Sequence, residues 1–297
     1  MSESKTAGFI GVGMMGHGLA KNVQQAGYVL KFLDHPGNRP VDDLLAKGAE
    51  PLSSPAEIGR ACDFIFLVVT GSPEVEDAVF GQDGLLEGLA PGKTVIDCST
   101  ALPESTLKVA AAIQAKGARY ADAPMTRTPK EAEEGRVNVM VGADDATYAV
   151  VEPLLKIIAE NIYRGGGIGA GHQLKLLHNY VSMAQPAILA ETFNAARRGG
   201  VDLGTLCEVL ESGGGGSTSL KRLMPYLMDG ELDQFRFSIA NACKDLGYYA
   251  GMASALGVPS VIAAATHQVY VMARSQGKGP DPVPTMIDFI DSIAVKK

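Results

Sequence analysis

Two segments of this 297-residue chain carry residues whose types and spacing suit chemistry. The first holds three glycines spaced Gly11-x-Gly13-x-x-Gly16 between an apolar run and a helix-like run, as a pyrophosphate-binding turn requires. The second places Lys175 and Asn179 four residues apart in a long apolar segment, where a charged amine costs free energy unless it has a function. The first segment indicates what is bound, and the second indicates what is done to a bound molecule.

Each glycine of the first segment has its own physical role. Gly11 permits a tight turn after the strand, Gly13 lets backbone N–H groups approach a phosphate, and Gly16 lets the next helix pack close to the sheet. The alternative is a glycine-rich turn that binds no ligand. The spacing predicts a dinucleotide cofactor bound by Gly11, Gly13, Met14, Met15 and Gly16.

The residues after the second predicted strand bear on which dinucleotide is bound. Asp34 ends this strand, and a carboxylate there accepts hydrogen bonds from the adenine-ribose hydroxyls and repels a 2′-phosphate. Asp34 therefore favours NAD over NADP. Asn38 and Arg39 follow closely, however, and an arginine in that loop can bind a 2′-phosphate, so NADP remains the less favoured alternative.

Later strand ends are expected to face the same cofactor. Val69 ends one predicted strand and Thr70 follows it, and Thr100 lies shortly after the next strand. Thr100 has a second interpretation, as the N-cap of the helix that begins near Pro103, and the two roles are compatible.

Composition narrows the class of protein. The chain has 26 basic and 33 acidic residues without a Lys/Arg cluster, so we expect no nucleic-acid partner. Its four cysteines lie far apart, with neither disulfide nor zinc spacing, so we expect small buried residues and no metal site. We see no signal peptide, and the apolar runs are too short to span a membrane, so we expect a cytoplasmic protein without a membrane partner.

The first half of the chain alternates short β-type runs with amphipathic helix-type runs. Predicted strands are Ala7–Gly11, Val29–Leu33, Phe64–Val69, Thr94–Asp97, Tyr120–Ala123 and Val137–Val141. Predicted helices are Gly16–Gln25, Arg39–Lys47, Pro73–Phe80, Pro103–Lys116 and Asp145–Ile158. This alternation predicts a doubly wound α/β fold, a mainly parallel sheet with helices on both faces. The direction of the later strands is left open.

After the glycine cluster at 165–171 the pattern becomes helical. Residues Gln173 to Arg197 predict one long helix, with a kink at Pro186. Further predicted helices are Leu203–Ser212, Ser219–Asp229, Ile239–Leu256, Ser260–Gln276 and Thr285–Ala294. We therefore predict a dinucleotide-binding domain at residues 1–170 and an all-α domain at 171–297, joined by the long helix.

On that helix, Lys175, His178, Asn179 and Ser182 are spaced i, i+3, i+4 and i+7, which places them along one face. Desolvation disfavours an ammonium ion, so a buried lysine can be tuned to donate or accept a proton. An amide one turn away can hold a substrate without titrating. The alternative is a solvated polar stripe on the surface.

Four motifs in order resemble the β-hydroxyacid dehydrogenase family, which includes 3-hydroxyisobutyrate dehydrogenase and tartronate semialdehyde reductase. They are the glycine turn, Asp122-Ala-Pro-Met-Thr126 with Val139-Met-Val-Gly-Ala-Asp144, Gly171-x-x-x-Lys175-x-x-x-Asn179, and Lys244-Asp245-Leu246-Gly247. The resemblance runs from about residue 7 to 290. It implies a Rossmann-type domain followed by a helical domain, with homodimers or homotetramers as the usual assembly.

The same resemblance implies roles for individual residues. Lys175 corresponds to the catalytic acid/base, Asn179 to a substrate-positioning residue, and Lys244 to a residue near the nicotinamide end of the cofactor. The Lys-x-x-His-Asn pattern also resembles 6-phosphogluconate dehydrogenase, where a glutamate seven residues after the lysine serves decarboxylation. Here that position is Ser182, which favours hydride transfer alone. Imine reductases generally lack the lysine, so Lys175 argues against them.

One segment departs from the family pattern. The usual Asp-x-Pro-Val-Ser-Gly-Gly holds the substrate carboxylate on backbone amides, whereas this chain has Thr126, Arg127 and Thr128 after the proline and methionine. A similar Arg-Thr pair occurs in the sulfolactaldehyde reductases of this family. This chain departs from those reductases at His178. We expect Thr126 to keep the hydroxyl role and Arg127 to bind a sulfonate, phosphonate or carboxylate. The alternative for Arg127 is a structural ion pair with Glu131, Glu133 or Glu134.

Together these features predict an NAD-dependent oxidoreductase that interconverts a small anionic 3-hydroxy acid, or a hydroxy-sulfonate, with its aldehyde or ketone. Thr126, Arg127, Thr128, His178 and Ser182 are the expected substrate-binding residues. An imine-reducing enzyme and a non-catalytic dinucleotide-binding sensor or scaffold are the alternatives. We expect only capping or surface roles for His17 and His172.

Overall fold

The computed structural model describes residues 5–295 of the chain. The chain folds into two compact units, the first ending at Lys175 and the second beginning at Leu176. The predicted boundary between residues 170 and 171 remains a prediction, because the helix α9 (Ala170–Gly199) runs through this region.

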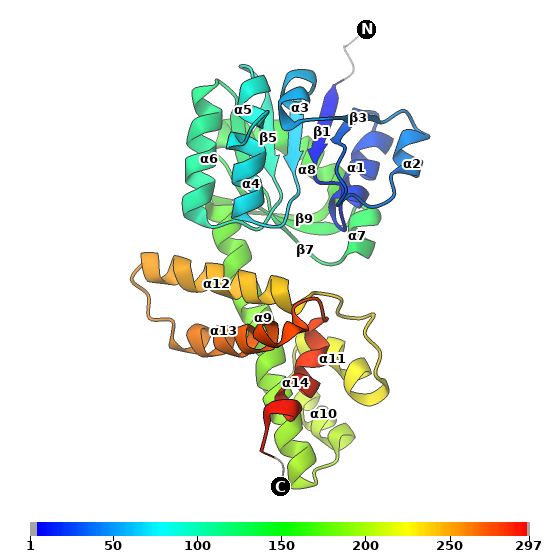
Figure 1. Ribbon diagram of the computed structural model, residues 1–297, viewed down its shortest axis with the longest axis vertical. Helices are drawn as coiled ribbons and strands as arrows, with labels where there is room; N and C mark the ends of the chain where they lie inside the picture. Colours follow the sequence, from blue (N-terminus) through cyan, green and yellow to red (C-terminus); the bar gives the residue numbers. More distant parts are fainter. Residues whose placement is uncertain (1–4, 296–297) are drawn as a thin grey trace. The chain divides into compact units, whose positions relative to one another are not determined.

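The first unit is built on one twisted sheet (Figure 1). Its strands are β1 (Thr6–Ile10), β2 (Val29–Leu33), β3 (Glu50–Leu52), β4 (Phe64–Leu67), β5 (Thr94–Asp97), β6 (Arg119–Asp122), β7 (Met125–Thr126), β8 (Val137–Gly142) and β9 (Ala159–Gly166). In the order β3-β2-β1-β4-β5-β6 all neighbours are parallel. The strand β8 then pairs antiparallel with β6 and β7 and parallel with β9.

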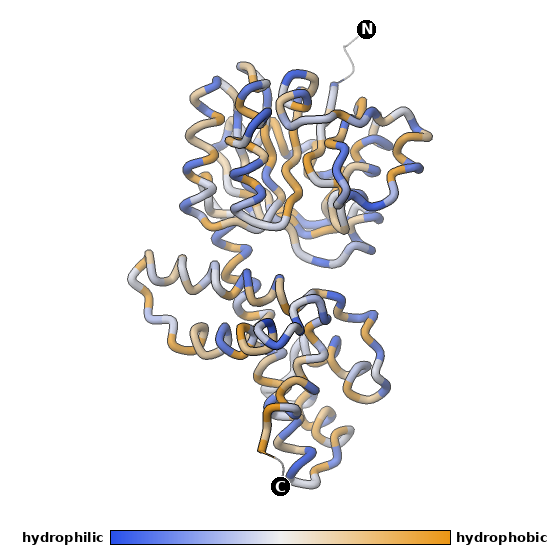
Figure 2. Tube along the Cα trace, viewed as in Figure 1, coloured by the Kyte–Doolittle hydropathy of each residue, from blue (hydrophilic) through white to orange (hydrophobic). Residues whose placement is uncertain are grey.

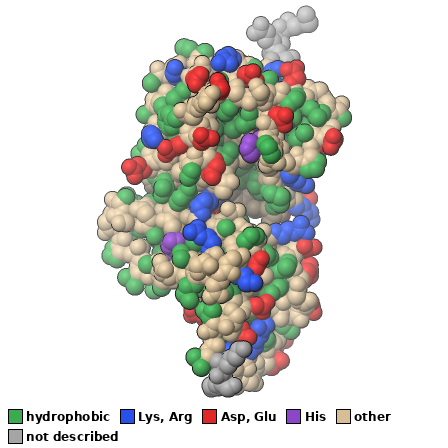
Figure 3. Space-filling model, in the orientation of Figure 1, with side chains coloured by type: hydrophobic (Ala, Val, Ile, Leu, Met, Phe, Trp, Pro, Cys, Tyr) green, Lys and Arg blue, Asp and Glu red, His purple; other side chains and the backbone are tan. Residues whose placement is uncertain are grey.

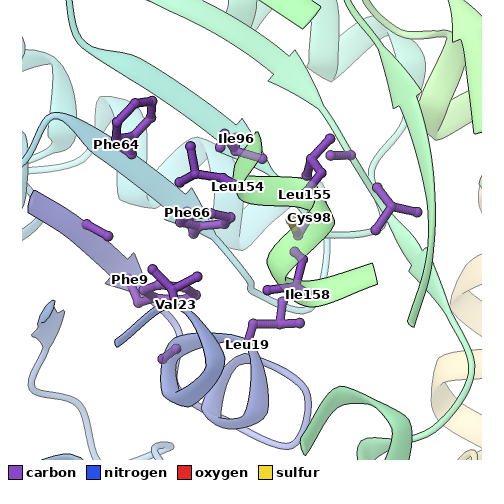
Figure 4. Close-up of a cluster of buried hydrophobic side chains, with 14 of the residues drawn as sticks. Phe9, Leu19, Val23, Phe64, Phe66, Ile96, Cys98, Leu154, Leu155 and Ile158 are labelled. Atoms are coloured by element: carbon purple, nitrogen blue, oxygen red, sulfur yellow. The ribbon is translucent and has the colours of Figure 1, made fainter. Parts of the chain in front are cut away.

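Helices cover both faces of this sheet. They are α1 (Gly16–Gln25), α2 (Asp42–Leu45), α3 (Pro55–Ala61), α4 (Ser72–Phe80), α5 (Leu85–Gly88), α6 (Pro103–Ala115), α7 (Pro129–Glu133) and α8 (Asp145–Ile158). One face packs against α1 and α8, where Leu19 and Ile158 meet Phe9 and Phe66 (Figure 4). The other packs against α3, α4, α5 and α6. Figure 2 shows the apolar character of the central strands that makes this double coverage necessary.

The second unit is helical throughout its described residues. After α9 follow α10 (Leu203–Ser212), α11 (Thr218–Asp229), α12 (Ile239–Ala255), α13 (Val261–Ala273), η1 (Arg274–Lys278), η2 (Val283–Thr285) and α14 (Met286–Ile293). Its core includes Phe193, Leu246 and Tyr270, all fully buried. The Tyr270 hydroxyl donates to the Met183 carbonyl over 2.9 Å, which satisfies the polar group of this buried ring.

The predicted fold class, a Rossmann-type doubly wound sheet followed by an all-α domain, is confirmed. Individual elements differ. The predicted helix Arg39–Lys47 shrinks to α2, because Pro40 and a bond from the Arg39 N–H to the Val12 carbonyl hold the earlier residues in a loop. The predicted long helix is present as α9, which includes Pro186, and the kink expected there remains a prediction. The short elements β3, β7, α5 and α7, as well as α3 and β9, were not predicted.

Candidate active site

The carboxyl ends of the parallel strands lie along one edge of the sheet. The register pairs Ile10 with Leu67, Leu67 with Asp97, and Asp97 with Asp122, so the loops that follow these strands share that edge. The sheet order reverses direction between β1 and β4. Ligands of doubly wound folds bind outside the carboxyl ends of the strands at this switch point.

The glycine-rich turn after β1 fits a dinucleotide pyrophosphate. Gly11 has φ +101°, and a Cβ there would lie 2.3 Å from the Val68 carbonyl oxygen. A Cβ on Gly16 would lie 2.0 Å from the Gly11 oxygen. At Gly13, by contrast, the nearest atom to such a Cβ is 3.7 Å away, so this side of the backbone is open. Two glycines are therefore required by packing, and the third leaves room for a close ligand.

The two methionines of this turn lie at the start of α1. Met15 is the N-cap residue of the helix, and its side chain makes no capping bond. Met14 is 56% exposed. A large apolar side chain exposed next to a glycine turn is available to cover a bound cofactor, and the contact of both methionines with a cofactor remains a prediction.

The loop after β2 carries Asp34 and is tied to the glycine turn. Asp34 is exposed and lines a shallow pocket with Pro51, Leu52 and Ser53. Asn38 accepts a hydrogen bond from the Val12 N–H over 3.2 Å and donates to the Leu33 carbonyl over 2.9 Å. The structure thus places an acidic side chain at the end of the second strand, where an adenine ribose would lie.

The loops after β4 and β5 are also tied to each other. The Val69 N–H donates to Ser99 Oγ over 3.1 Å, and the Ser99 N–H donates to the carboxylate of Asp97 over 2.9 Å. Thr70 and Thr100 follow in these loops. The N-cap residue of α6 is Leu102, so the capping interpretation of Thr100 is wrong, and its expected contact with the cofactor remains a prediction.

The start of α9 is held by a buried network centred on Asp122. The Asp122 carboxylate accepts the N–H of Gly169 over 2.7 Å and that of His172 over 2.8 Å. Burial raises the pKa of Asp122, more than the His172 charge and these backbone bonds lower it. This carboxylate therefore fixes the first turn of the helix that carries Lys175.

His172 belongs to the same network, so the expected surface role is wrong. The side chain is fully buried, with Nδ1 2.7 Å from Thr106 Oγ1 and Nε2 3.2 Å from the Ser99 carbonyl. His17 is also buried, and its ring nitrogens contact Asp43 and Glu133. Both histidines join separate elements of the first unit.

Lys175 reaches the short strand β7. Its Nζ donates to the Met125 carbonyl over 2.7 Å, and the side chain is half-buried. Met125 directly precedes Thr126, whose Oγ1 accepts a bond from Asn138 over 3.3 Å. The amine that sequence reasoning singled out therefore lies beside the segment predicted to bind substrate.

Arg127 has a backbone conformation that favours glycine. Its φ is +83°, in the left-handed region. Its guanidinium pairs with Glu160 and donates to the Arg136 carbonyl over 2.5 Å. The chain thus keeps a glycine-like backbone turn while placing a cation there, and the ion-pair partner is none of the three glutamates considered from the sequence.

Thr128 caps the helix α7. Its N–H donates to the Glu131 carboxylate over 3.0 Å, and its hydroxyl donates to the same carboxylate. This capping box fixes the end of the Thr126–Thr128 segment. Any substrate contact by Thr128 would compete with it.

In the second unit, Asn179 is the centre of a polar chain. Its Nδ2 donates to Asp245 over 2.5 Å, and its Oδ1 lies 2.9 Å from His178 Nδ1. Asp245 also pairs with Lys244, at 2.8 Å. The structure therefore joins three predicted site residues through Asp245. Asp245 belongs to the Lys244–Gly247 motif, but the sequence predicted no role for it.

Ser182 lies one turn beyond His178 on α9 and is half-buried. Its carbonyl accepts a bond from Ser219 Oγ over 3.4 Å, which ties this turn to α11. The substrate roles of His178 and Ser182 remain predictions.

Comparison with known proteins identifies the family. A family model described as the NAD-binding domain of 6-phosphogluconate dehydrogenase matches residues 6–167. A second, described as NAD-binding of NADP-dependent 3-hydroxyisobutyrate dehydrogenase, matches residues 169–290. The chain belongs to the β-hydroxyacid dehydrogenase family.

Individual relatives agree with this assignment. The 3-sulfolactaldehyde reductase of Escherichia coli is 32% identical over 272 residues, which is 91% of each chain. The 2-(hydroxymethyl)glutarate dehydrogenase of Eubacterium barkeri is 30% identical over 97% of this chain and 95% of its own. The crystal structure of 3-hydroxyisobutyrate dehydrogenase from Salmonella typhimurium superposes with a TM-score of 0.83 at 27% identity, covering 96% of this chain and all of that one.

Membership defines the general activity. The β-hydroxyacid dehydrogenase is an oxidoreductase that acts on CH–OH groups with a nicotinamide dinucleotide. Within residues 5–295, no helix is both long enough and apolar enough to cross a membrane. Figure 3 shows acidic and basic side chains interspersed on the visible face.

Proposed function

We propose that this β-hydroxyacid dehydrogenase uses NAD in preference to NADP. The support is the carboxylate of Asp34 at the end of β2, beside the shallow pocket formed with Pro51, Leu52 and Ser53. A carboxylate at this position accepts hydrogen bonds from ribose hydroxyls and repels a 2′-phosphate.

We further propose that the enzyme interconverts a small anionic 3-hydroxy acid, or a hydroxy-sulfonate, with its aldehyde or ketone. The observation that carries this proposal is the position of Lys175, whose amine is bound to the Met125 carbonyl next to Thr126 and Arg127. A proton donor on α9 is thus bound to the short segment that carries a cation for an anionic substrate.

When bound, the nicotinamide supplies or accepts the hydride. Lys175 donates a proton to the substrate oxygen in reduction and takes one from the hydroxyl in oxidation. The Met125 carbonyl aims the amine, because it accepts one of the three ammonium hydrogens. Thr126 orients the substrate through its hydroxyl.

The proposal also assigns roles to residues of the second unit. Asn179 orients the substrate with an amide that Asp245 and His178 hold in one orientation. His178 and Ser182 supply further substrate contacts, and Lys244 serves the nicotinamide end of the cofactor. Assembly as a homodimer or homotetramer and a cytoplasmic location remain predictions.

Arg127 gives the enzyme its preference for a strongly anionic substrate. The named relative that reduces 3-sulfolactaldehyde supports a sulfonate. To reach a substrate the guanidinium must leave Glu160, whose side chain is 46% exposed. Ion pairs at such exposure are weak, so replacing the Glu160 carboxylate by the anionic group of a substrate costs little free energy.

The proposal is tested by following NADH and NADPH absorbance separately with succinic semialdehyde, tartronate semialdehyde and sulfolactaldehyde. We expect faster turnover with NADH and with the anionic aldehyde that Arg127 fits best. Turnover of carboxylates alone would keep the enzyme class and exclude the sulfonate. Turnover of cyclic imines lacking an acid group, or cofactor binding with no turnover, would replace the proposal by an imine reductase or a non-catalytic binding protein.

A further inference from the structure

A cluster of charged side chains joins the cofactor half of the first unit to the segment that follows Thr128. Its centre is Glu133, the last residue of α7. The helix α7 packs directly on α1, because a Cβ on Gly18 would lie 2.5 Å from the Ala132 carbonyl carbon. Asn22 of α1 also donates to the carbonyls of Ala132 and Glu133, over 3.0 and 3.3 Å. Glu133 therefore has a fixed position beside the start of α1.

Three basic side chains converge on the Glu133 carboxylate. His17 Nδ1 lies 2.8 Å from Oε1, Lys21 Nζ lies 3.0 Å from Oε2, and Arg39 Nη1 lies 3.5 Å from Oε1. The other ring nitrogen of His17 contacts Asp43 at 3.0 Å. Partial burial raises the pKa of Glu133, but the bonds and charges of His17 and Lys21 outweigh it and hold this pKa below its ordinary value. Glu133 is therefore an anion at neutral pH.

Arg39 is the member of this cluster closest to the proposed ribose site in sequence. It lies in the same loop as Asp34, and its N–H donates to the Val12 carbonyl over 3.0 Å, inside the glycine turn. An arginine in this loop is the group that binds a 2′-phosphate in NADP-dependent enzymes of this fold. Here its guanidinium already has a carboxylate partner.

We propose that Glu133 is a cofactor-selectivity residue. Its carboxylate competes with a 2′-phosphate for the Arg39 guanidinium and adds a negative charge beside it. Asp34 repels the phosphate at the ribose, and Glu133 weakens the attraction to Arg39 that would otherwise compensate. This inference rests on the proposed preference for NAD.

The test measures binding of two fragments of the cofactor, ADP and 2′,5′-ADP, by calorimetry, without turnover. In Glu133→Gln we expect affinity for 2′,5′-ADP to rise about tenfold, as expected when a charge-assisted partner becomes available. Affinity for ADP stays within about twofold. The matched control is Glu134→Gln, since Glu134 pairs with Arg136 at 3.0 Å and not with Arg39. This control leaves both affinities unchanged.

Two further variants keep the proposal falsifiable. Arg39→Ala in the Glu133→Gln background must abolish the gain, and a gain that persists would overturn the role of Arg39. Arg39→Ala alone must leave 2′,5′-ADP binding unchanged, whereas a large loss would show that Arg39 is already available. An equal change for ADP and 2′,5′-ADP in Glu133→Gln would mean that Glu133 only supports the fold. If the unmodified protein binds 2′,5′-ADP as tightly as ADP, the NAD preference itself fails, independently of the variants.

Discussion

At the scale of single residues, the site depends on how a few polar side chains are held. Lys175 is bound to a carbonyl, Asn179 to the buried Asp245, and Arg127 to Glu160. The first two contacts orient the amine of Lys175 and the amide of Asn179. Both groups can still bind a substrate, because an ammonium and an amide each keep further hydrogens to donate. The third must break before Arg127 can bind a substrate.

Replacement of Lys175 separates a catalytic from a structural lysine. In Lys175→Ala we expect kcat to fall about a hundredfold to ten-thousandfold, the usual contribution of a general acid. NADH affinity, measured by fluorescence titration, should stay within about twofold, because the glycine turn and Asp34 are untouched. Lys116→Ala, an exposed lysine at the end of α6, serves as the control. Lost NADH affinity in Lys175→Ala would point to a structural role instead.

Arg127 can be tested through its charge. In Arg127→Ala we expect turnover of a sulfonated aldehyde to fall while turnover of an uncharged aldehyde is retained. The control is Arg136→Ala, since Arg136 also faces Glu160, at 3.5 Å, but lies outside the predicted substrate segment. Steady-state kinetics with both aldehydes measure the two rates. An equal loss of turnover on both would contradict the proposed binding of the substrate anion by Arg127.

At the scale of elements, short pieces of structure set the geometry of the site. The strand β7 has two residues and α7 has five, yet they carry Thr126 and Glu133. The turn between them needs the left-handed backbone of Arg127, which disfavours any residue with a Cβ. The start of α9 needs Asp122 as an acceptor for two N–H groups.

Backbone strain at Arg127 predicts an order of stabilities. Arg127→Gly should be more stable than Arg127→Ala by about 1 kcal/mol, because only glycine adopts a φ of this sign without cost. At Arg136, which has no positive φ, glycine should be no more stable than alanine. Urea unfolding of the four variants gives the comparison. Equal stability of the two Arg127 variants would show that the turn relaxes.

The capping carboxylate of α9 gives a second prediction at this scale. In Asp122→Asn the amide oxygen accepts one N–H, and the NH₂ group faces the other donor, so unfolding free energy should fall by about 1–3 kcal/mol. The exposed Asp145→Asn, at the start of α8, should change little. Urea unfolding measures both. An unchanged stability of Asp122→Asn would mean that one of these two hydrogen bonds contributes little to the free energy of unfolding.

At the scale of the whole molecule, buried and paired carboxylates make stability depend on pH. Asp43, like Glu133, has a pKa below its ordinary value, because the bond and charge of His17 outweigh partial burial. A lowered folded pKa contributes stability above the unfolded value, and this contribution is lost as the pH falls through the folded value. Asp122 acts in the opposite direction, since its raised pKa favours folding when it is protonated.

We therefore expect the free energy of unfolding to fall as the pH drops below the ordinary glutamate value of 4.5. In Glu133→Gln this fall should be smaller, because one carboxylate with a lowered pKa is gone. Urea unfolding at a series of pH values between neutrality and acid measures the slope for both proteins. A steeper fall in Glu133→Gln would contradict the assignment of Glu133 as a stabilising anion.

The features that the sequence by itself determined are local motifs and the repeating order of strands and helices. The glycine turn, Asp34 at a strand end and the i, i+4 spacing of Lys175 and Asn179 follow from neighbours along the chain. The α/β alternation predicted the layered fold. Strands of two or three residues such as β3 and β7 were missed, because so few residues show no hydrophobic period and are ordered only by their partners.

Only the tertiary structure decided which distant residues meet. The contact of Asn179 with Asp245 spans 66 positions, and that of His17 with Glu133 spans 116. Arg127 forms an ion pair with Glu160, on β9, and not with the three glutamates that follow Arg127 closely in sequence. Charge and burial explain why each such pair is favourable once formed, but the strand order that brings β9 beside β8 selects the partner.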